Sequence, residues 1–172
     1  FDEAARWYRR GAEARPKEWV GWLQNGGALD RAGRWNAARR ALERAVKLAP
    51  AEPQALNYLG YARLARDKDA GPATRLIERA SALAPGDADI TDSLGWAYFL
   101  EGDANRAVPL LERAAAARPD VGEINEHLGD AYWTLGRRYE ARYAWRAAAI
   151  GAAVADTERL SGKIAFGLPA GR

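Results

Sequence analysis

Acidic side chains stand three residues apart at two places in the chain, where Asp89 precedes Asp92 and Glu123 precedes Glu126. On a helix, residues i and i+3 share a face, so each pair has the spacing to hold a cation. Neither pair lies beside a loop that would supply the remaining oxygen ligands of a metal site. The pairs therefore predict an acidic surface, and the sequence indicates no metal and no other cofactor.

The one histidine, His127, directly follows Glu126. A single histidine argues against a Ser-His-Asp triad and against a metal site built from histidines. The absence of cysteine excludes thiol catalysis, disulfides and cysteine-held zinc. His127 could titrate at a binding surface, but an ordinary surface histidine is the simpler interpretation. No nucleophile stands beside a matching base in the sequence, so we expect a protein that is not an enzyme.

Charges are unevenly distributed along the chain, although its formal net charge is only +3. Residues 88–101 and 122–134 each carry three acidic residues and no Lys or Arg, whereas residues 36–48 have a net charge of +3 and residues 105–118 of +2. Aromatic side chains such as Trp96 and Trp133 fall in the acidic segments. Nucleic-acid binding combines aromatic side chains with basic ones, so we expect no nucleic acid as a partner.

The elements that must position these residues repeat along the sequence. Four prolines are spaced by 34, 35 and 34 residues. An alanine stands twelve residues before each proline and a large apolar residue eight before it, while a glycine recurs upstream. The prolines are Pro16, Pro50, Pro85 and Pro119; the alanines are Ala4, Ala38, Ala73 and Ala107; the large residues are Tyr8, Leu42, Ile77 and Leu111; the glycines are Gly26, Gly60, Gly95 and Gly129.

This 34-residue period of small and large residues resembles the tetratricopeptide-repeat family over nearly the whole chain. The resemblance implies an all-α, right-handed solenoid of antiparallel helix pairs. The first helix of each repeat unit is called helix A and the second helix B, and the small residues let the two pack closely against each other. It makes residues 1–153 the repeat domain, with one extra residue expected in the turn at Asp67–Pro72. The units are a truncated one at 1–16 and full ones at about 19–50, 53–85, 88–119 and 122–153.

The two ends of the repeat domain differ from its middle. In residues 154–172 we expect a capping helix with Leu160, Ile164 and Phe166 on one side, followed by a short tail. The first unit lacks its helix A, so Trp7 and Tyr8 are expected to be uncovered, and residues 1–14 could associate with a second copy of the chain. Because the first residues look like the middle of a helix, we expect that the chain was cut from a longer protein.

In this family, helices A line a concave groove through positions that the packing motif leaves free. We therefore expect a groove for a peptide or protein segment that bears basic and apolar residues. Two simpler interpretations stay open: the aromatic side chains could pack between helices, and the carboxylates could form a solvated face or stabilise helix N-termini. The expected groove residues are Tyr58, Tyr61, Asp89, Asp92, Trp96, Phe99, Glu123, Glu126, His127, Asp130 and Trp133.

Residues 90–149 also resemble the C-terminal repeats of proteobacterial outer-membrane tetratricopeptide lipoproteins, through runs such as DSLGWAYFLEGDANRA and EHLGDAYWTLGRRYEA. That resemblance implies a periplasmic scaffold anchored through a missing N-terminal segment, although the lack of cysteine fits the cytoplasm equally well. No apolar run approaches the roughly 20 residues that cross a bilayer, so we expect no membrane insertion of this segment. The sequence thus predicts a non-catalytic protein-interaction scaffold; the alternative is a structural module that self-assembles through its open terminal repeat.

Overall fold

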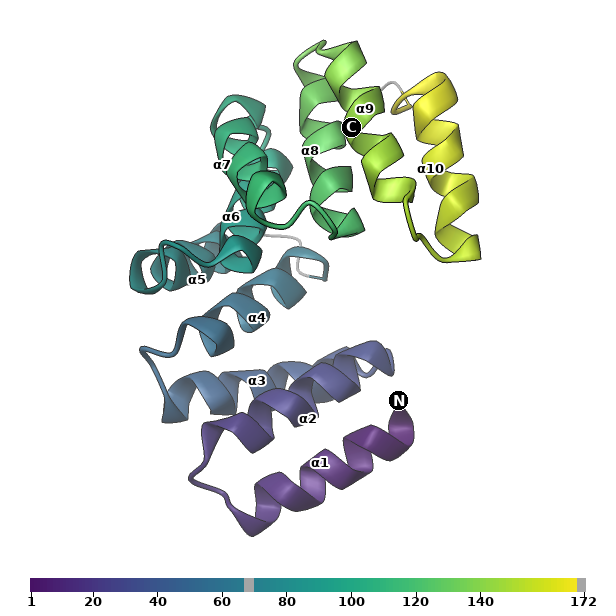
Figure 1. The fold of residues 1–172 in the computed structure, drawn as a ribbon. Helices are drawn as coiled ribbons and strands as arrows, with labels where there is room; N and C mark the ends of the chain where they lie inside the picture. Colours follow the sequence, from purple (N-terminus) through teal and green to yellow (C-terminus); the bar gives the residue numbers. More distant parts are fainter. Residues whose placement is uncertain (67–69, 170–172) are drawn as a thin grey trace. The chain divides into compact units, whose positions relative to one another are not determined.

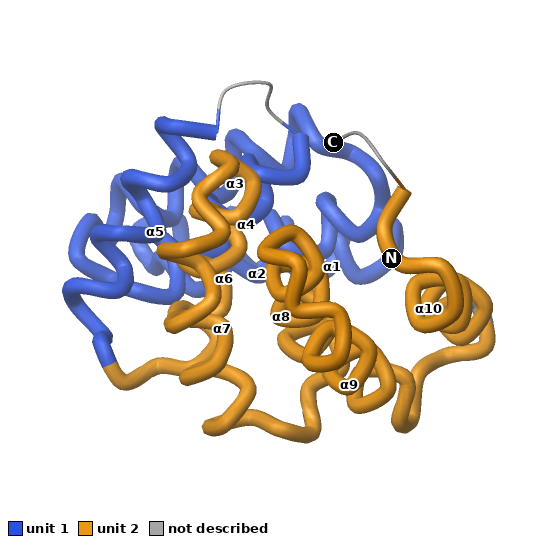
Figure 2. The backbone as a smooth tube through the Cα atoms, turned by 90° about the horizontal axis from the view of Figure 1, so that it is seen from above, with its two compact units in different colours: residues 1–85 blue, residues 86–172 orange. Residues whose placement is uncertain are grey.

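The computed structural model describes residues 1–66 and 70–169, and these residues form ten α-helices and no strand. The all-α class predicted from the sequence is confirmed. The chain divides into two compact units, unit 1 at Phe1–Pro85 and unit 2 at Gly86–Arg172, which Figure 2 colours separately. The extra residue expected in the turn at Asp67–Pro72 falls partly outside the described residues.

Helices that are consecutive in the sequence pack against one another within each unit (Figure 1). In unit 2, the first and third helices also contact each other. The helices of unit 1 are α1 (Asp2–Ala14), α2 (Trp19–Arg31), α3 (Trp35–Leu48), α4 (Pro53–Leu64) and α5 (Gly71–Leu83). Those of unit 2 are α6 (Ala88–Leu100), α7 (Ala104–Ala117), α8 (Gly122–Thr134), α9 (Arg138–Ala149) and α10 (Val154–Phe166).

Glycines and prolines mark the ends of the helices. Gly33, Gly102 and Gly136 follow α2, α6 and α8 and have φ angles of 72°, 86° and 76°. Glycine adopts this left-handed conformation without the strain that a side chain would cause. A proline stands two residues after the last residue of α1, α3, α5 and α7; these are Pro16, Pro50, Pro85 and Pro119.

The repeated glycine lies against the large apolar residue of the paired helix. A Cβ atom on Gly95 would lie 2.8 Å from Leu111 Cγ, and one on Gly60 would lie 2.6 Å from Ile77 Cγ1. Both distances are shorter than van der Waals contact, so the helices can pack at this separation only because no side chain is present. The predicted close approach of helices A and B is confirmed. The other two pairs of this kind are Gly26 with Leu42 and Gly129 with Trp145.

Replacing Gly95 with leucine should lower the free energy of unfolding by about 1–3 kcal/mol or more, because the new side chain overpacks the contact with Leu111. The matched control is Gly11→Leu in α1, where an added Cβ meets no atom within 4 Å. That change should be neutral or slightly stabilising, because leucine favours a helix over glycine by up to about 1 kcal/mol. Urea unfolding followed by circular dichroism measures both. Equal stability of the two variants would contradict the packing described here.

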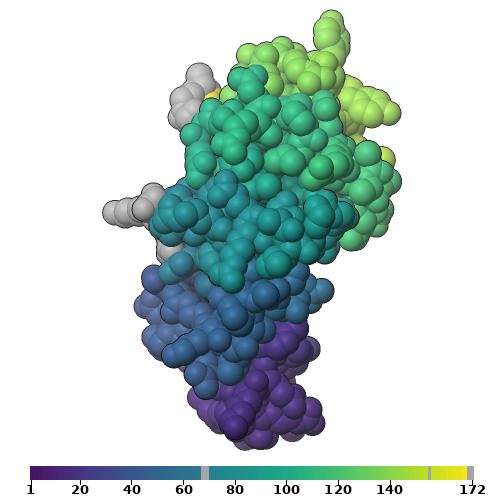
Figure 3. Space-filling view, turned by 90° about the vertical axis from the view of Figure 1, so that its left-hand side faces the viewer, coloured from purple at the N-terminus to yellow at the C-terminus, as the bar shows by residue number. Residues whose placement is uncertain are grey.

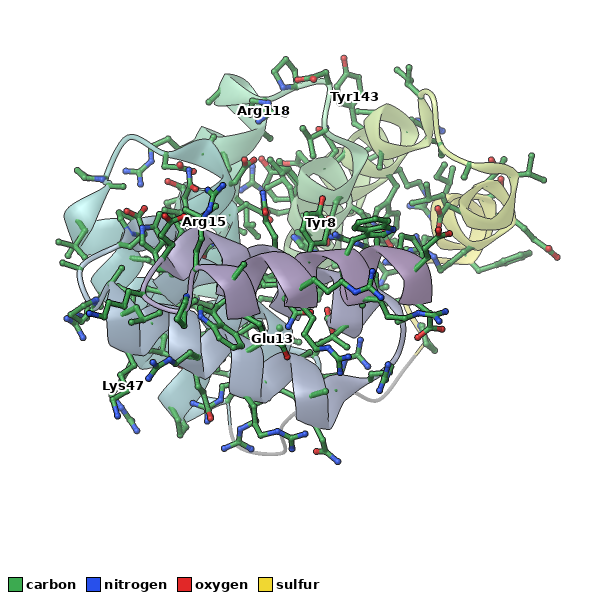
Figure 4. All side chains as sticks on the ribbon, turned by 90° about the horizontal axis from the view of Figure 1, so that it is seen from below. Tyr8, Glu13, Arg15, Lys47, Arg118 and Tyr143 are labelled. Atoms are coloured by element: carbon green, nitrogen blue, oxygen red, sulfur yellow. The ribbon has the colours of Figure 1, made fainter. Side chains whose placement is uncertain are left out.

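Helix α1 lies at the edge of unit 1, and among the described helices it packs against α2 (Figure 1, Figure 3). Its aromatic side chains are open to solvent, as the sequence predicts for a repeat that lacks its first helix. Trp7 is 64% exposed and Tyr8, which Figure 4 labels, is 38% exposed. The face of α1 that does pack buries small residues, Ala5 and Ala12.

Helix α10 packs against α9 at the end of unit 2. Leu160 is buried, at 2% exposure, and Ile164 is half-buried, as expected for the apolar side of this helix. The expectation that Phe166 shares this side is wrong, since its side chain is 86% exposed. The reason is helical geometry: Ile164 follows Leu160 by about one turn, whereas Phe166 lies about 120° from Leu160 around the helix axis.

Candidate functional site: an acidic cavity in unit 2

A cavity of about 660 Å³ lies between α8 and α10 in unit 2, with Trp96 of α6 on its wall. Apolar atoms from Trp96, Ile150 and Leu160 contribute to its lining. Five carboxylates and two cations also line it, so its net charge is −3 with His127 neutral. The carboxylates are Asp120, Glu123, Glu126, Asp130 and Asp156, and the cations are Arg159 and Lys163.

Helix α8 brings its acidic side chains to this cavity because of their spacing. Glu123, Glu126 and Asp130 follow one another at intervals of three and four residues, which places them along one helix face. The helix begins at Gly122, where a Cβ atom would lie 2.9 Å from the carbonyl oxygen of Ala148. The glycine therefore allows the start of α8 to lie directly against the end of α9.

Helix α6 is capped at its N-terminus by Asp87, whose carboxylate accepts a hydrogen bond from the Ile90 backbone N–H at 3.0 Å. Such an N-cap satisfies one of the backbone donors that the first turn leaves without a partner. This fixed helix presents Trp96 to the cavity. The Phe99 ring stacks on Trp96, with ring centroids 4.9 Å apart and an interplanar angle of 19°.

His127 links α8 to α6 through a buried polar contact. Its Nδ1 lies 3.0 and 3.1 Å from the two carboxylate oxygens of Asp92, and since an ionised carboxylate only accepts, Nδ1 is the donor. Trp96 stacks on the imidazole ring, with centroids 4.0 Å apart and an interplanar angle of 14°. Asp92 and His127 are each 6% exposed, so the interpretation of His127 as a surface histidine is wrong. The aromatic ring and the carboxylate remove it from solvent.

Lys163 of α10 binds two carboxylates of α8 at once. Its Nζ donates to Glu126 Oε1 at 2.6 Å and to the two oxygens of Asp130 at 2.7 and 2.8 Å. Arg159, four residues earlier on α10, also forms an ion pair with Glu126. Asp130 accepts a further hydrogen bond, at 2.8 Å, from the indole N–H of Trp145. The acidic face of α8 is therefore already partly neutralised by cations of the same chain.

These contacts change the acidity of Glu126. Burial alone raises the pKa of its carboxyl, but hydrogen bonds from Arg159 and Lys163 outweigh burial, and the pKa lies below its ordinary value. A lowered folded-state pKa means that the ionised form stabilises the fold. That stabilisation is fully present above the ordinary value of 4.5 and is lost as the pH falls through the lowered pKa.

We expect Glu126→Gln to destabilise the protein at neutral pH, by about 1–3 kcal/mol for a partly buried, charge-assisted network. The difference from the unmodified protein should shrink as the pH falls from 4.5 through the lowered pKa of Glu126, where the carboxyl of the folded protein also becomes protonated. Urea unfolding at pH 7, 5, 4 and 3 measures this difference. Glu3→Gln, which removes an exposed carboxylate of α1, is the control and should show no such convergence. A constant difference at every pH would contradict the role given to the ionised Glu126.

Five of the expected groove residues line the cavity, and the others are not among its lining residues. Asp92 contacts the lining residue His127, and Phe99 stacks on the lining residue Trp96. Asp89 is exposed and forms an ion pair with Arg118 at 3.3 Å. Tyr58 and Tyr61 belong to α4 in unit 1. The five cavity residues are Trp96, Glu123, Glu126, His127 and Asp130.

Trp133 does not line the cavity. Its ring lies 5.4 Å from that of Trp145, and the Arg138 guanidinium lies 3.7 Å from its centroid. Gly167, just after α10, passes so close to the Trp133 ring that a Cβ atom there would overlap it. Gly167 has a φ of 82°, which favours glycine for a second reason. Trp133 therefore packs against Trp145, Arg138 and Gly167.

Tyr58 in unit 1 has its own local partners. Its hydroxyl accepts a hydrogen bond from Arg31 at 3.5 Å, and a Cβ atom on Gly27 would lie 2.9 Å from the same hydroxyl oxygen. Burial raises the pKa of Tyr58, while the Arg31 charge lowers it and Asp30 raises it further. Tyr61, one turn further along α4, is half-buried.

Sequence reasoning missed the cations of the site. It used residues 154–172 only for their apolar side, although Arg159 and Lys163 stand four residues apart beside Leu160 and Ile164. That spacing places both cations on one helix face and was the available signal. The basic side chains of α3 and α7 are not among the lining residues of the cavity. On α3, Arg40, Arg44 and Lys47 are exposed, and Figure 4 shows Lys47 projecting away from the helices of its unit.

In residues 1–66 and 70–169, no group of three or more His, Cys, Asp or Glu side chains is placed to hold a metal ion. In the same ranges, no helix has both the length and the apolar character that crossing a membrane requires.

Comparison with solved structures gives the fold a family context. No family model and no curated protein matches the chain. The crystal structure of MamA protein matches at 26% identity and a TM-score of 0.66 over 100% of this chain and 89% of that one. A thermophilic TPR protein of Thermus thermophilus matches at 22% identity and a TM-score of 0.78 over 94% and 89% of the two chains. PilW, a type IV pilus biogenesis factor, matches at 19% identity and a TM-score of 0.79 over 93% and 74%. The chain is therefore a helical-repeat protein with the tetratricopeptide-repeat fold.

Proposed function

We propose that the chain is a non-catalytic scaffold that binds a basic, apolar protein segment at the acidic cavity of unit 2. The likeness to tetratricopeptide-repeat proteins supports a protein-interaction scaffold in general. The observation that carries the specific proposal is the charge of the cavity, which stays at −3 even with the two cations of α10 included. A cavity with excess carboxylates attracts cationic segments and repels acidic ones.

In this proposal, Glu123 contributes electrostatic attraction and Trp96 contributes contact area. Glu123 is an exposed carboxylate on the cavity lining, so its charge acts on a partner mainly by long-range attraction. Trp96 is on the cavity lining, and its ring is already fixed by stacking on His127 and Phe99. A rigid aromatic ring gives contact area at little cost in conformational entropy, and tryptophan is a common anchor of interfaces.

The experiment selects peptides from a random phage-displayed library on the full chain and measures the most enriched peptide by biolayer interferometry. We expect selected peptides to combine Lys or Arg with apolar residues. Glu123→Gln should slow association and flatten its dependence on salt, because screening acts over about 8 Å at 0.15 M ionic strength. Trp96→Ala should speed dissociation by about 30-fold, as the loss of an anchor worth about 2 kcal/mol would.

Two exposed side chains outside the cavity serve as controls for this experiment. Glu3→Gln removes an acidic charge from α1, and Arg44→Gln removes a basic charge from α3. Both variants should bind the selected peptide with unchanged rates. If Arg44→Gln alters binding while Glu123→Gln and Trp96→Ala do not, the basic helices are the working surface and the proposed function is wrong.

A second candidate function is self-assembly through residues 1–14. It is favoured by the 64% exposure of Trp7 on α1, which among the described helices packs on α2 alone. Large exposed aromatic surface marks interaction sites. Sedimentation velocity at rising protein concentration tests it. Association that Trp7→Ser abolishes would support this candidate, and a monomer at every concentration would exclude it.

A further inference from the structure

We propose that α10 is an internal competitor at the acidic cavity, and that the partner segment is a helix with two basic side chains one turn apart that takes the place of Arg159 and Lys163. The inference rests on the proposed function and gives it a partner geometry and a form of regulation. The contacts, the burial and the charge of α10 each support it.

The contacts show α10 bound to α8 by its cations. Its helix packs on α9, and the cavity separates it from α8. Arg159 and Lys163 reach the acidic face of α8, where Lys163 contacts Glu126 and Asp130 within 2.6–2.8 Å. Because the cations are four residues apart, one face of one helix supplies both. The chain thus carries its own example of a ligand that the acidic face accepts.

Helix α10 buries few of its described side chains. Among its described side chains, Leu160 alone is buried, while Val154 and Phe166 are 90% and 86% exposed. Arg159 is 48% exposed, so its ion pairs with Glu126 and Asp156 are partly screened by water. Elements with few buried apolar contacts open at lower free energy than the core of the same domain. Helix α10 is therefore the helix of unit 2 with the fewest buried side chains to lose among those described, and an incoming helix has to replace the contacts of Lys163, whose side chain is 16% exposed, with Glu126 and Asp130.

The charge of the cavity favours an incoming helix over α10. The cations of α10 leave excess negative charge, and α10 itself places one of the carboxylates, Asp156, on the lining. When α10 leaves, Asp120, Glu123, Glu126 and Asp130 remain. A helix with the same two cations and no acidic residue on that face therefore has more favourable electrostatic contacts with the cavity than α10 has.

The test uses a fluorescein-labelled peptide of residues 154–169 and measures its binding to the full chain by fluorescence anisotropy. The chain is compared with its Arg159→Gln/Lys163→Gln variant, in which α10 keeps Leu160 but loses its cations. We expect the peptide to bind the variant about tenfold more tightly or better, because the variant spends more time with the acidic face open. The same peptide with both cations replaced by glutamine is the matched control and should bind neither chain.

The outcomes separate the inference from the proposed function. If the peptide of residues 154–169, or a basic library peptide, binds both chains with equal affinity, α10 is only a structural cap and the inference is overturned, while the proposed function stands. If neither chain binds any basic peptide, the proposed function fails and the inference with it. Circular dichroism checks that the double variant is folded, and Lys163→Gln alone replaces it if it is not.

A second measurement uses the unmodified chain and does not depend on any variant. Amide hydrogen exchange is followed with and without a saturating basic library peptide. We expect exchange in residues 154–166 to become faster on binding, and exchange in α6 and α8 to become slower or stay unchanged. Slower exchange in α10 on binding would mean that the partner adds to α10 instead of replacing it, which overturns the inference.

Discussion

Replacing Asp130 with alanine is expected to lower the free energy of unfolding by about 3–5 kcal/mol, the usual cost of breaking a buried ion pair from one side. The carboxylate is 7% exposed and accepts hydrogen bonds from both Lys163 and Trp145. Without it, the buried indole N–H of Trp145 has lost its acceptor, and Lys163 is held by Glu126 alone among the contacts of its Nζ described above. Leaving a buried donor unsatisfied costs more than the hydrogen bond contributed.

Urea unfolding followed by circular dichroism measures this loss, and two further variants locate its cause. Asp130→Asn keeps an acceptor for Trp145 and removes only the charge, so its loss should be smaller. Asp89→Ala removes an exposed carboxylate of α6 whose pair with Arg118 is open to solvent, and should cost less than about 1 kcal/mol. If Asp130→Ala and Asp89→Ala are equally stable, Asp130 is not the polar centre of unit 2.

Replacing Trp145 with alanine is expected to destabilise the protein by about 3–5 kcal/mol, because a fully buried large side chain leaves a cavity. Its ring covers Gly129 of α8 and lies 5.4 Å from the Trp133 ring. Tyr143→Ala on the same helix is the matched control, since its side chain is 76% exposed, and should change stability by no more than about 0.5 kcal/mol. The loss of stability caused by Trp145→Phe should lie between the losses caused by Trp145→Ala and Tyr143→Ala. Equal losses at positions 143 and 145 would contradict the packing of α9 on α8.

The fold could be predicted because the residues of one packing contact recur in each repeat. Gly95 against Leu111 is a small residue facing a large one across a helix pair, and both positions recur at the repeat period. In the last repeat a tryptophan, Trp145, occupies the large position opposite Gly129. The sequence identified the glycine but not this partner, because the proline that sets the register is missing after the last unit.

The site could be predicted only in part, because its contacts join residues far apart in the chain. The sequence identified the acidic face of α8, which depends on spacing within one helix. It missed the contact between Asp92 and His127, which are 35 residues apart, and the contact between Lys163 and Asp130, which are 33 apart. Such contacts depend on how neighbouring helices are positioned. Helical periodicity alone gives the face of a residue, not its partner.

The most direct test of the central claim, that the acidic cavity of unit 2 binds a basic segment, is to map where such a segment lies. A basic library peptide carrying a photoreactive benzoylphenylalanine is cross-linked to the full chain, and the attachment sites are identified by mass spectrometry. We expect cross-links to the cavity lining, at Trp96 and at Glu123–His127 of α8, and their loss at high salt. Cross-links concentrated on the basic helices α3 or α7, with none on the cavity lining, would contradict the claim.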